Sequence, residues 1–195
     1  MAKTRMLICF IVVVPIMIVC LSLLLLTRGT VRELPQRQIR PTVKRFIGLE
    51  LPSKADNLRA LFHSYRGVEN VSLAFQTDQQ GWSYILDAFA GKKHIHRHEF
   101  PQPEGNPFEW NARGAFWLSC SYQNQLRVRI FDEDLINRIQ SDHLEYVNTG
   151  HYPKDAVTGY YLKGISGDPM SELVFYHILV FKDRGLVYIY AAKEA

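Results

Sequence analysis

The chain has 195 residues, of which 47% are hydrophobic and 12% aromatic, and it carries a formal net charge of +4. This length and apolar content suit one folded domain with a core, and they exclude a disordered chain. Residues 1–45 hold eight Lys and Arg against Glu33, so they carry +7 and leave −3 for the remainder. A nucleic-acid-binding domain needs a basic face on its folded part, so this distribution argues against that class.

A short basic leader, residues 1–5, precedes a run of 21 uncharged residues from Met6 to Leu26. About 20 apolar residues in a helix cross the hydrocarbon core of a bilayer. We therefore predict a single-pass transmembrane signal-anchor over 6–26, in which Pro15 is tolerated as a kink. The alternative is a cleaved signal peptide, but its apolar region is usually shorter and ends at a small-residue cleavage site.

Residues 27–45 contain Gly29, Pro35, Pro41 and scattered Arg, which predicts an extended linker close to the membrane. A basic residue near an anionic surface contributes about 1 kcal/mol of attraction. We therefore expect anionic lipid headgroups beside the arginines of this segment, which are Arg28, Arg32, Arg37 and Arg40.

Two features of the sequence give opposite predictions for the side of the membrane on which the domain lies. Six basic residues follow the predicted span and two precede it, which favours a cytoplasmic domain under the positive-inside rule. A very N-terminal apolar segment behind a short basic leader is instead typical of an export signal-anchor, and large domains translocate in spite of flanking charge. We interpret the protein as an inner-membrane protein with an extracytoplasmic domain, and the cytoplasmic placement is the alternative.

A single globular domain is predicted over 46–195. In its first part, apolar and polar residues alternate in short runs bounded by turn residues, as in strands with one buried face. A helix is predicted over 77–91 because Trp82, Ile85, Leu86 and Phe89 form one apolar stripe behind Thr77, a candidate N-cap. Strands are expected over 46–51, 57–65 and 71–76.

The second part of the domain contains two predicted hairpins. The pattern indicates one hairpin over 115–131, a short helix from Asp132 and a loop from His143. A closing hairpin joins 173–181 to 186–190 through a Lys-Asp-Arg-Gly turn. Between them we expect a strand over 159–163 and a turn over 164–170. Strands joined by short loops, with a few helices, predict an α+β fold with a mostly antiparallel sheet and one or two packed helices.

A resemblance enters at the start of this domain. Residues 49–58 read Leu-Glu-Leu-Pro-Ser-Lys-Ala-Asp-Asn-Leu, and an apolar strand ending at Phe75 and a helix follow. This stretch of about 45 residues, with its Leu-Pro-x-x-Ala-x-Asn segment, resembles small uncharacterised bacterial proteins. Those proteins carry an N-terminal anchor or lipoprotein signal before one compact domain. The resemblance implies a bacterial membrane-anchored protein and transfers no activity, cofactor or site residue.

The segment His94-Ile95-His96-Arg97-His98-Glu99 is the strongest candidate site in the sequence. Alternate residues of a strand share a face, so His94, His96 and His98 could present imidazoles to Zn²⁺ or a similar ion, with Glu99 or Glu104 nearby. Ligands at this spacing lie about 6–7 Å apart, which is wide for one metal ion. The alternative interpretation, a solvated edge strand, predicts no structural metal and no cofactor.

Other chemistry-bearing residues have simpler interpretations. Cys120 shares a face with apolar residues, so we expect a buried structural cysteine in place of a nucleophile. Asp132, Glu133 and Asp134 are typical of a helix cap and an acidic first turn. The glycine pair of residues 164–168 lacks the lysine of a phosphate-binding loop.

Two function classes follow from these patterns. The first is a membrane-anchored, non-catalytic domain that binds a partner or supports an envelope structure. The second is a membrane-anchored metal-binding protein or metal-dependent enzyme that uses His94, His96 and His98. Converging imidazoles in a pocket would favour the second class, and imidazoles splayed into solvent would favour the first.

Overall fold

The computed structural model describes residues 14–18, 30–65, 68–92, 94–102, 133–168 and 172–194. Most of the apolar run at 6–26 lies outside these residues, and the helical turn at 14–18 is the part of it that is described. Within the described ranges, no helix has both the length and the apolar character needed to cross a bilayer. The transmembrane helix therefore stays a prediction.

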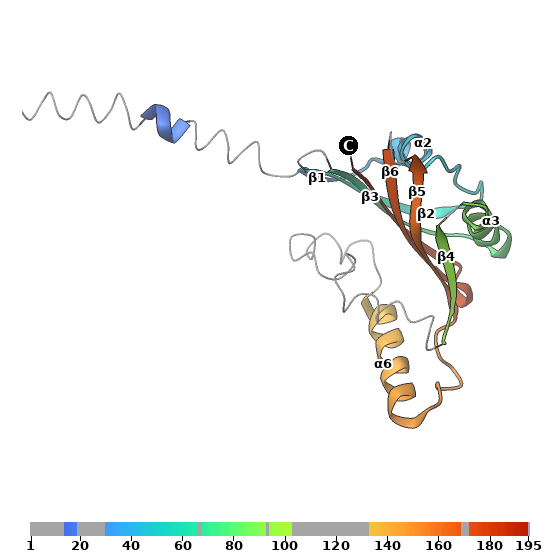
Figure 1. Ribbon diagram of the computed structural model, residues 1–195. Helices are drawn as coiled ribbons and strands as arrows, with labels where there is room; N and C mark the ends of the chain where they lie inside the picture. The colour runs from blue at the N-terminus through green and yellow to red at the C-terminus, as the bar shows by residue number, and fades with distance from the viewer. Residues whose placement is uncertain are drawn as a thin grey trace, which may run out of the picture.

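One antiparallel sheet of seven strands organises the domain, in the order β1-β2-β3-β7-β6-β5-β4. The predicted α+β class and antiparallel sheet are confirmed. Helices α2 and α3 lie over one face of the sheet and α6 lies on the other side (Figure 1). In chain order the elements are β1 Thr30–Glu33, α2 Gln36–Ile47, β2 Asp56–Tyr65, β3 Val68–Gln76, α3 Gln79–Ala90, β4 Ile95–Phe100, α6 Glu133–Thr149, β5 Gly159–Asp168, β6 Glu172–Phe181, the 3-10 turn η2 Lys182–Arg184, and β7 Leu186–Glu194.

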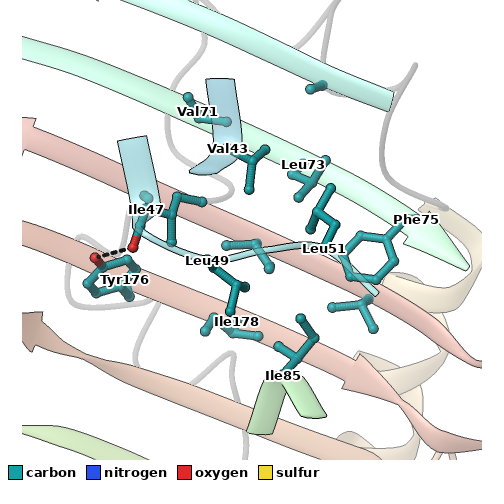
Figure 2. Close-up of a cluster of buried hydrophobic side chains, with 14 of the residues drawn as sticks. Val43, Ile47, Leu49, Leu51, Val71, Leu73, Phe75, Ile85, Tyr176 and Ile178 are labelled. Carbon is teal, nitrogen blue, oxygen red and sulfur yellow. Dashed lines mark hydrogen bonds between the residues drawn. The ribbon is translucent and has the colours of Figure 1, made fainter. Parts of the chain in front are cut away.

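The larger core lies between the sheet and the helices α2 and α3. Figure 2 shows Val43 and Ile47 of α2 and Ile85 of α3 among the side chains of β3 and β6. Alternate residues of the central strands point into this layer, and those of β3 and β6 include Leu73 and Ile178, which are fully buried. Burial of this apolar surface is the main favourable contribution to folding.

The extended linker predicted over 27–45 is wrong from Thr30 onward. β1 pairs with the end of β2, with Thr30 opposite Ser64, and α2 buries Ile39 and Val43 completely. The helix forms in spite of Pro41 because its apolar side packs on the sheet, and tertiary burial outweighs local propensity. The globular domain therefore includes residues ahead of the predicted boundary at 46.

The strand predicted over 46–51 is also absent from the structure. Phe46 and Ile47 end α2, and Gly48 caps it in the left-handed conformation with φ 72°. The residues after it form an irregular loop that still buries Leu49 and Leu51. A loop that packs on the core can bury alternate residues. In the sequence, this pattern looks the same as that of a strand with one buried face.

The predicted helix over 77–91 is confirmed as α3, with a different cap. Asp78, not Thr77, accepts a hydrogen bond from the backbone N–H of Gly81 at 2.9 Å. The backbone N–H of Thr77 donates to the carbonyl of Gly185 at 2.8 Å, so Thr77 belongs to the end of the sheet.

The second part of the domain differs from the prediction in two places. Helix α6 continues to Thr149 through the predicted loop, and β5 continues to Asp168 through the predicted turn. β5 stays extended because it pairs with β6 along its whole length. The closing hairpin of β6 and β7 is confirmed, with Gly185 at φ 58° after η2. The hairpin predicted over 115–131 lies outside the described residues.

Candidate functional site

The second face of the sheet has an apolar part under α6. Leu135 and Ile139 of this helix pack on a cluster of aromatic and aliphatic residues that includes Phe100 and Phe181. One turn further on, the buried carboxylate of Asp142 accepts a hydrogen bond from the backbone N–H of Val157 at 2.9 Å. α6 therefore covers one end of this face.

The same face carries a group of polar side chains beside that apolar part. In the strand register His96, Lys163, His177 and Tyr190 lie in one row across β4, β5, β6 and β7, and His98 lies opposite Tyr161 in the next row. Direct cross-strand neighbours have Cβ atoms about 4.5–5.5 Å apart, so these side chains are adjacent. We call these six residues the histidine–tyrosine face.

A hydrogen bond lies at the centre of the histidine–tyrosine face. Tyr161 Oη and His177 Nδ1 are 2.5 Å apart, and their ring centroids are 5.9 Å apart. The ring of His177 also contacts the ring of Tyr190 at 6.1 Å. Tyr161 and Tyr190 are buried, with 1% and 5% of their surface exposed. The imidazole is therefore packed between two buried phenol rings.

Burial keeps both partners of this pair neutral. Burial, together with the nearby charge of Lys163, lowers the pKa of His177 to about 4. Burial likewise raises the pKa of Tyr161 above its ordinary value. At neutral pH the pair is a phenol bonded to an uncharged imidazole.

The outer part of the face is basic and accessible. His96 and Lys163 are exposed, and His98 is half-buried. Glu99 falls on the opposite face of β4 by alternation, so the described side chains on this face of β4, β5 and β6 include no carboxylate. The histidine–tyrosine face therefore offers a polar partner the ammonium of Lys163 and the imidazoles of His96 and His98.

The structure places the predicted histidine cluster at the edge of the sheet. His94 precedes β4 with φ 65°, whereas His96 and His98 share a face of the strand. Glu99 lies on the other face and pairs with Lys182. Among the described residues, no group of three or more His, Cys, Asp or Glu is placed to hold a metal ion. A metal site at these histidines stays a prediction, since Glu104 and Cys120 lie outside the described ranges.

Other predicted residues are accounted for by the fold. Glu133 and Asp134 open α6, as expected for acidic residues at a helix start, and Asp132 lies outside the described residues. Residues 164–168 belong to β5, so their glycines lie within a strand.

The arginines expected beside headgroups have different surroundings. Arg40 donates to the carbonyls of Leu51 and Pro52, both at 3.0 Å, and so holds the loop after α2. The guanidinium of Arg32 lies 5.4 Å from the ring centroid of Phe62. Arg37 is exposed near the start of α2, and Arg28 lies outside the described residues.

An open hollow of about 180 Å³ lies between α6, the loop before β5 and η2. Its charged side chains bond to their neighbours: Arg138 pairs with Asp155, and the hydroxyl of Thr158 donates to Asp183 at 2.9 Å. These bonds hold α6 and the loop before β5 on the sheet. The hollow is thus a junction of structural contacts and a weaker candidate than the histidine–tyrosine face.

No family model, curated protein or solved structure matches this chain. The resemblance of residues 49–58 to small membrane-anchored bacterial proteins therefore stays a prediction.

Proposed function

We propose that this chain is a single-pass inner-membrane protein whose domain is a non-catalytic binding module of the envelope. One observation carries the proposal: β1 is already paired in the sheet at Thr30, four residues after Leu26, where the uncharged run ends. Four residue steps of extended chain span at most about 14 Å. A helix over 6–26 would therefore hold the domain directly against the bilayer surface.

The histidine–tyrosine face supports binding over catalysis. Its innermost groups, Tyr161 and His177, are packed, bonded to each other and neutral, as in a structural core. Its outer groups, His96 and Lys163, are exposed donors without acidic neighbours on their face of β4, β5 and β6 in the described chain. Exposed polar groups on a rigid sheet suit recognition of a polar or acidic surface.

We place the domain on the extracytoplasmic side, as the short basic leader before the apolar run indicates. A domain tethered this closely presents its sheet only to partners at the membrane surface. The partner must therefore lie at the membrane surface and must complement the exposed basic groups of the face. An envelope protein with an acidic patch does both.

The test uses the full-length protein in native membranes with a photo-crosslinking residue at one of two exposed lysines. Position 163 lies on the histidine–tyrosine face, and position 154 lies in the loop after α6 as the matched control. Carbonate washing should leave the chain in the membrane pellet, and irradiation should give a discrete adduct from position 163 alone. Release of the chain by carbonate would refute the anchor. Equal adducts from both positions would refute the binding face.

A further inference from the structure

We infer that the domain rests on the bilayer through the corner formed by β1 and the C-terminal end of α2, where Arg45 contacts anionic headgroups. The inference depends on the proposed anchor over 6–26 and adds an orientation to it. It also moves the expected headgroup contact away from Arg37 and Arg40.

The chain enters the domain at one rim of the sheet. Thr30 lies opposite Ser64, close to the tip of the hairpin that joins β2 to β3. From there β1 runs away from this rim, until Glu33 lies opposite Leu61. We call the strand ends around Thr30 and Ser64 the N-terminal rim. It must face the membrane, because the tether is only a few residues long.

Helix α2 then returns to the same rim. It begins far from it, where the side-chain amide of Gln36 donates to the carbonyl of Leu58 at 2.5 Å. It ends near it, where the ring of Phe46 lies 6.3 Å from that of Phe62 and the ammonium of Lys193 lies 5.4 Å from the Phe46 ring centroid. Lys193 is one residue from the end of β7. The last turn of α2 is therefore beside the N-terminal rim.

Figure 2 shows a second contact of this helix end, the hydrogen bond from the Tyr176 hydroxyl to the carbonyl of Ile47 at 3.5 Å. In the strand register β7 ends beside the start of β3, with Glu194 opposite Val68, and in Figure 1 α6 lies toward the opposite end of the sheet. The described chain thus has one end at which the start of β1, the end of α2 and the end of β7 lie.

The charges at this end distinguish Arg45 from the other basic residues of α2. Lys44 pairs with Glu50, and the guanidinium of Arg40 donates hydrogen bonds to the carbonyls of Leu51 and Pro52. Arg45 is exposed in the last turn. Arg37 is also exposed, but it lies eight residues earlier, about 12 Å along the helix axis.

The acidic residues of the sheet end favour contact at one corner over contact along the whole rim. Glu69 lies opposite Lys193 in the register. Positions 168 and 172, both acidic in the sequence, are paired in the register where β5 meets β6, and β6 is four strands from β1, about 19 Å across the sheet. A domain that leans on its β1–α2 corner brings Arg45 to the headgroups and keeps these positions away from them.

The experiment measures the orientation in full-length protein with the native Cys9, Cys20 and Cys120 replaced by alanine. A spin label at Ser64→Cys reports on the N-terminal rim, and a label at Lys154→Cys reports on the opposite end. The protein is reconstituted in phosphatidylcholine vesicles, with or without phosphatidylserine, that contain a lipid bearing a nickel chelate on its headgroup. We expect stronger relaxation of the label at 64 than of the label at 154.

Charge variants on the same label test the role of Arg45. Arg45→Gln should remove the gain in relaxation that phosphatidylserine produces at position 64, and Arg37→Gln, the matched control, should leave it in place. Equal relaxation at 64 and 154, or equal effects of the two variants, would overturn the inference. Release of the protein from these vesicles by carbonate would instead overturn the proposed anchor, so the two failures are distinct.

Discussion

At the scale of single residues, the contact between Tyr161 and His177 is the feature that sequence reasoning missed. The two residues belong to the predicted strands 159–163 and 173–181, and alternation alone could place each of them on a face. Their contact cannot be predicted because residues 164–170, with two glycines, have the pattern of a turn. Register depends on where a strand ends, and a strand that continues through two glycines gives no local signal of its length.

Burial of His177 predicts a loss of stability in mild acid. Above pH about 6.5 this imidazole is neutral in both the folded and the unfolded chain, so it adds no pH dependence. Below that value the unfolded chain binds a proton that the folded chain excludes until pH about 4. The free energy of unfolding should therefore fall by about 1.4 kcal/mol per pH unit, roughly 3 kcal/mol over this range.

Urea unfolding of the full-length protein in detergent, followed from pH 7 to pH about 4, measures this loss. His177→Gln cannot take up a proton, so its stability should depend less on pH across the same range. His151→Gln, at an exposed position, is the control and should follow the unmodified protein. If the free energy of unfolding falls with pH equally in the unmodified protein and in His177→Gln, the loss does not come from His177.

At the scale of elements, the sequence does not predict helix α2 and predicts only the start of helix α6, for two different reasons. In α2 the buried positions Ile39, Val43, Phe46 and Ile47 have helical spacing, but Pro41 and the dense arginines concealed it. In α6 the stripe begins with Leu135 and Ile139 and continues with Asp142, a buried carboxylate. A search for apolar residues at helical spacing ends where the next buried position is polar. The predicted helix is therefore shorter than the observed one.

Asp142 therefore gives a test of how α6 is held on the sheet. Asp142→Ala would leave the half-buried N–H of Val157 without its acceptor, which should cost about 1–3 kcal/mol in the free energy of unfolding. Asp142→Asn keeps an acceptor oxygen and should recover much of this loss. Glu145→Ala, on the exposed side of the same helix, should change stability by less than about 0.5 kcal/mol. A similar cost for the substitutions at 142 and 145 would refute the role of this hydrogen bond.

At the scale of the whole molecule, fold class was predictable and domain extent was not. Strands joined by short loops specify an antiparallel sheet, and the closing hairpin is predicted with its turn in place, although β7 continues four residues beyond the predicted end at 190. The central pairing of β3 with β7 joins residues more than a hundred positions apart, and no local pattern encodes it. The candidate site depends on the same long-range order, because its residues come from four strands.

The extent of the domain predicts which soluble fragment will fold. A fragment of residues 30–195 keeps β1 and α2 and should unfold cooperatively. A fragment of residues 46–195 loses the edge strand and the fully buried Ile39 and Val43, each contributing about 1.5–3 kcal/mol. Domains of this size are stable by only about 5–15 kcal/mol in total, and the missing helix would also uncover the core around Val71.

Circular dichroism during heating compares the two fragments directly. The longer fragment should give one sharp transition, and the shorter one should aggregate or melt without a defined midpoint. A third fragment that begins at Gln36 separates the contributions, because it keeps α2 and removes β1 alone. It should fold with a lowered midpoint, since an edge strand of four residues buries less than the helix does. Equal midpoints for the fragments beginning at 30 and 46 would show that the core closes without α2, against the burial of its apolar side.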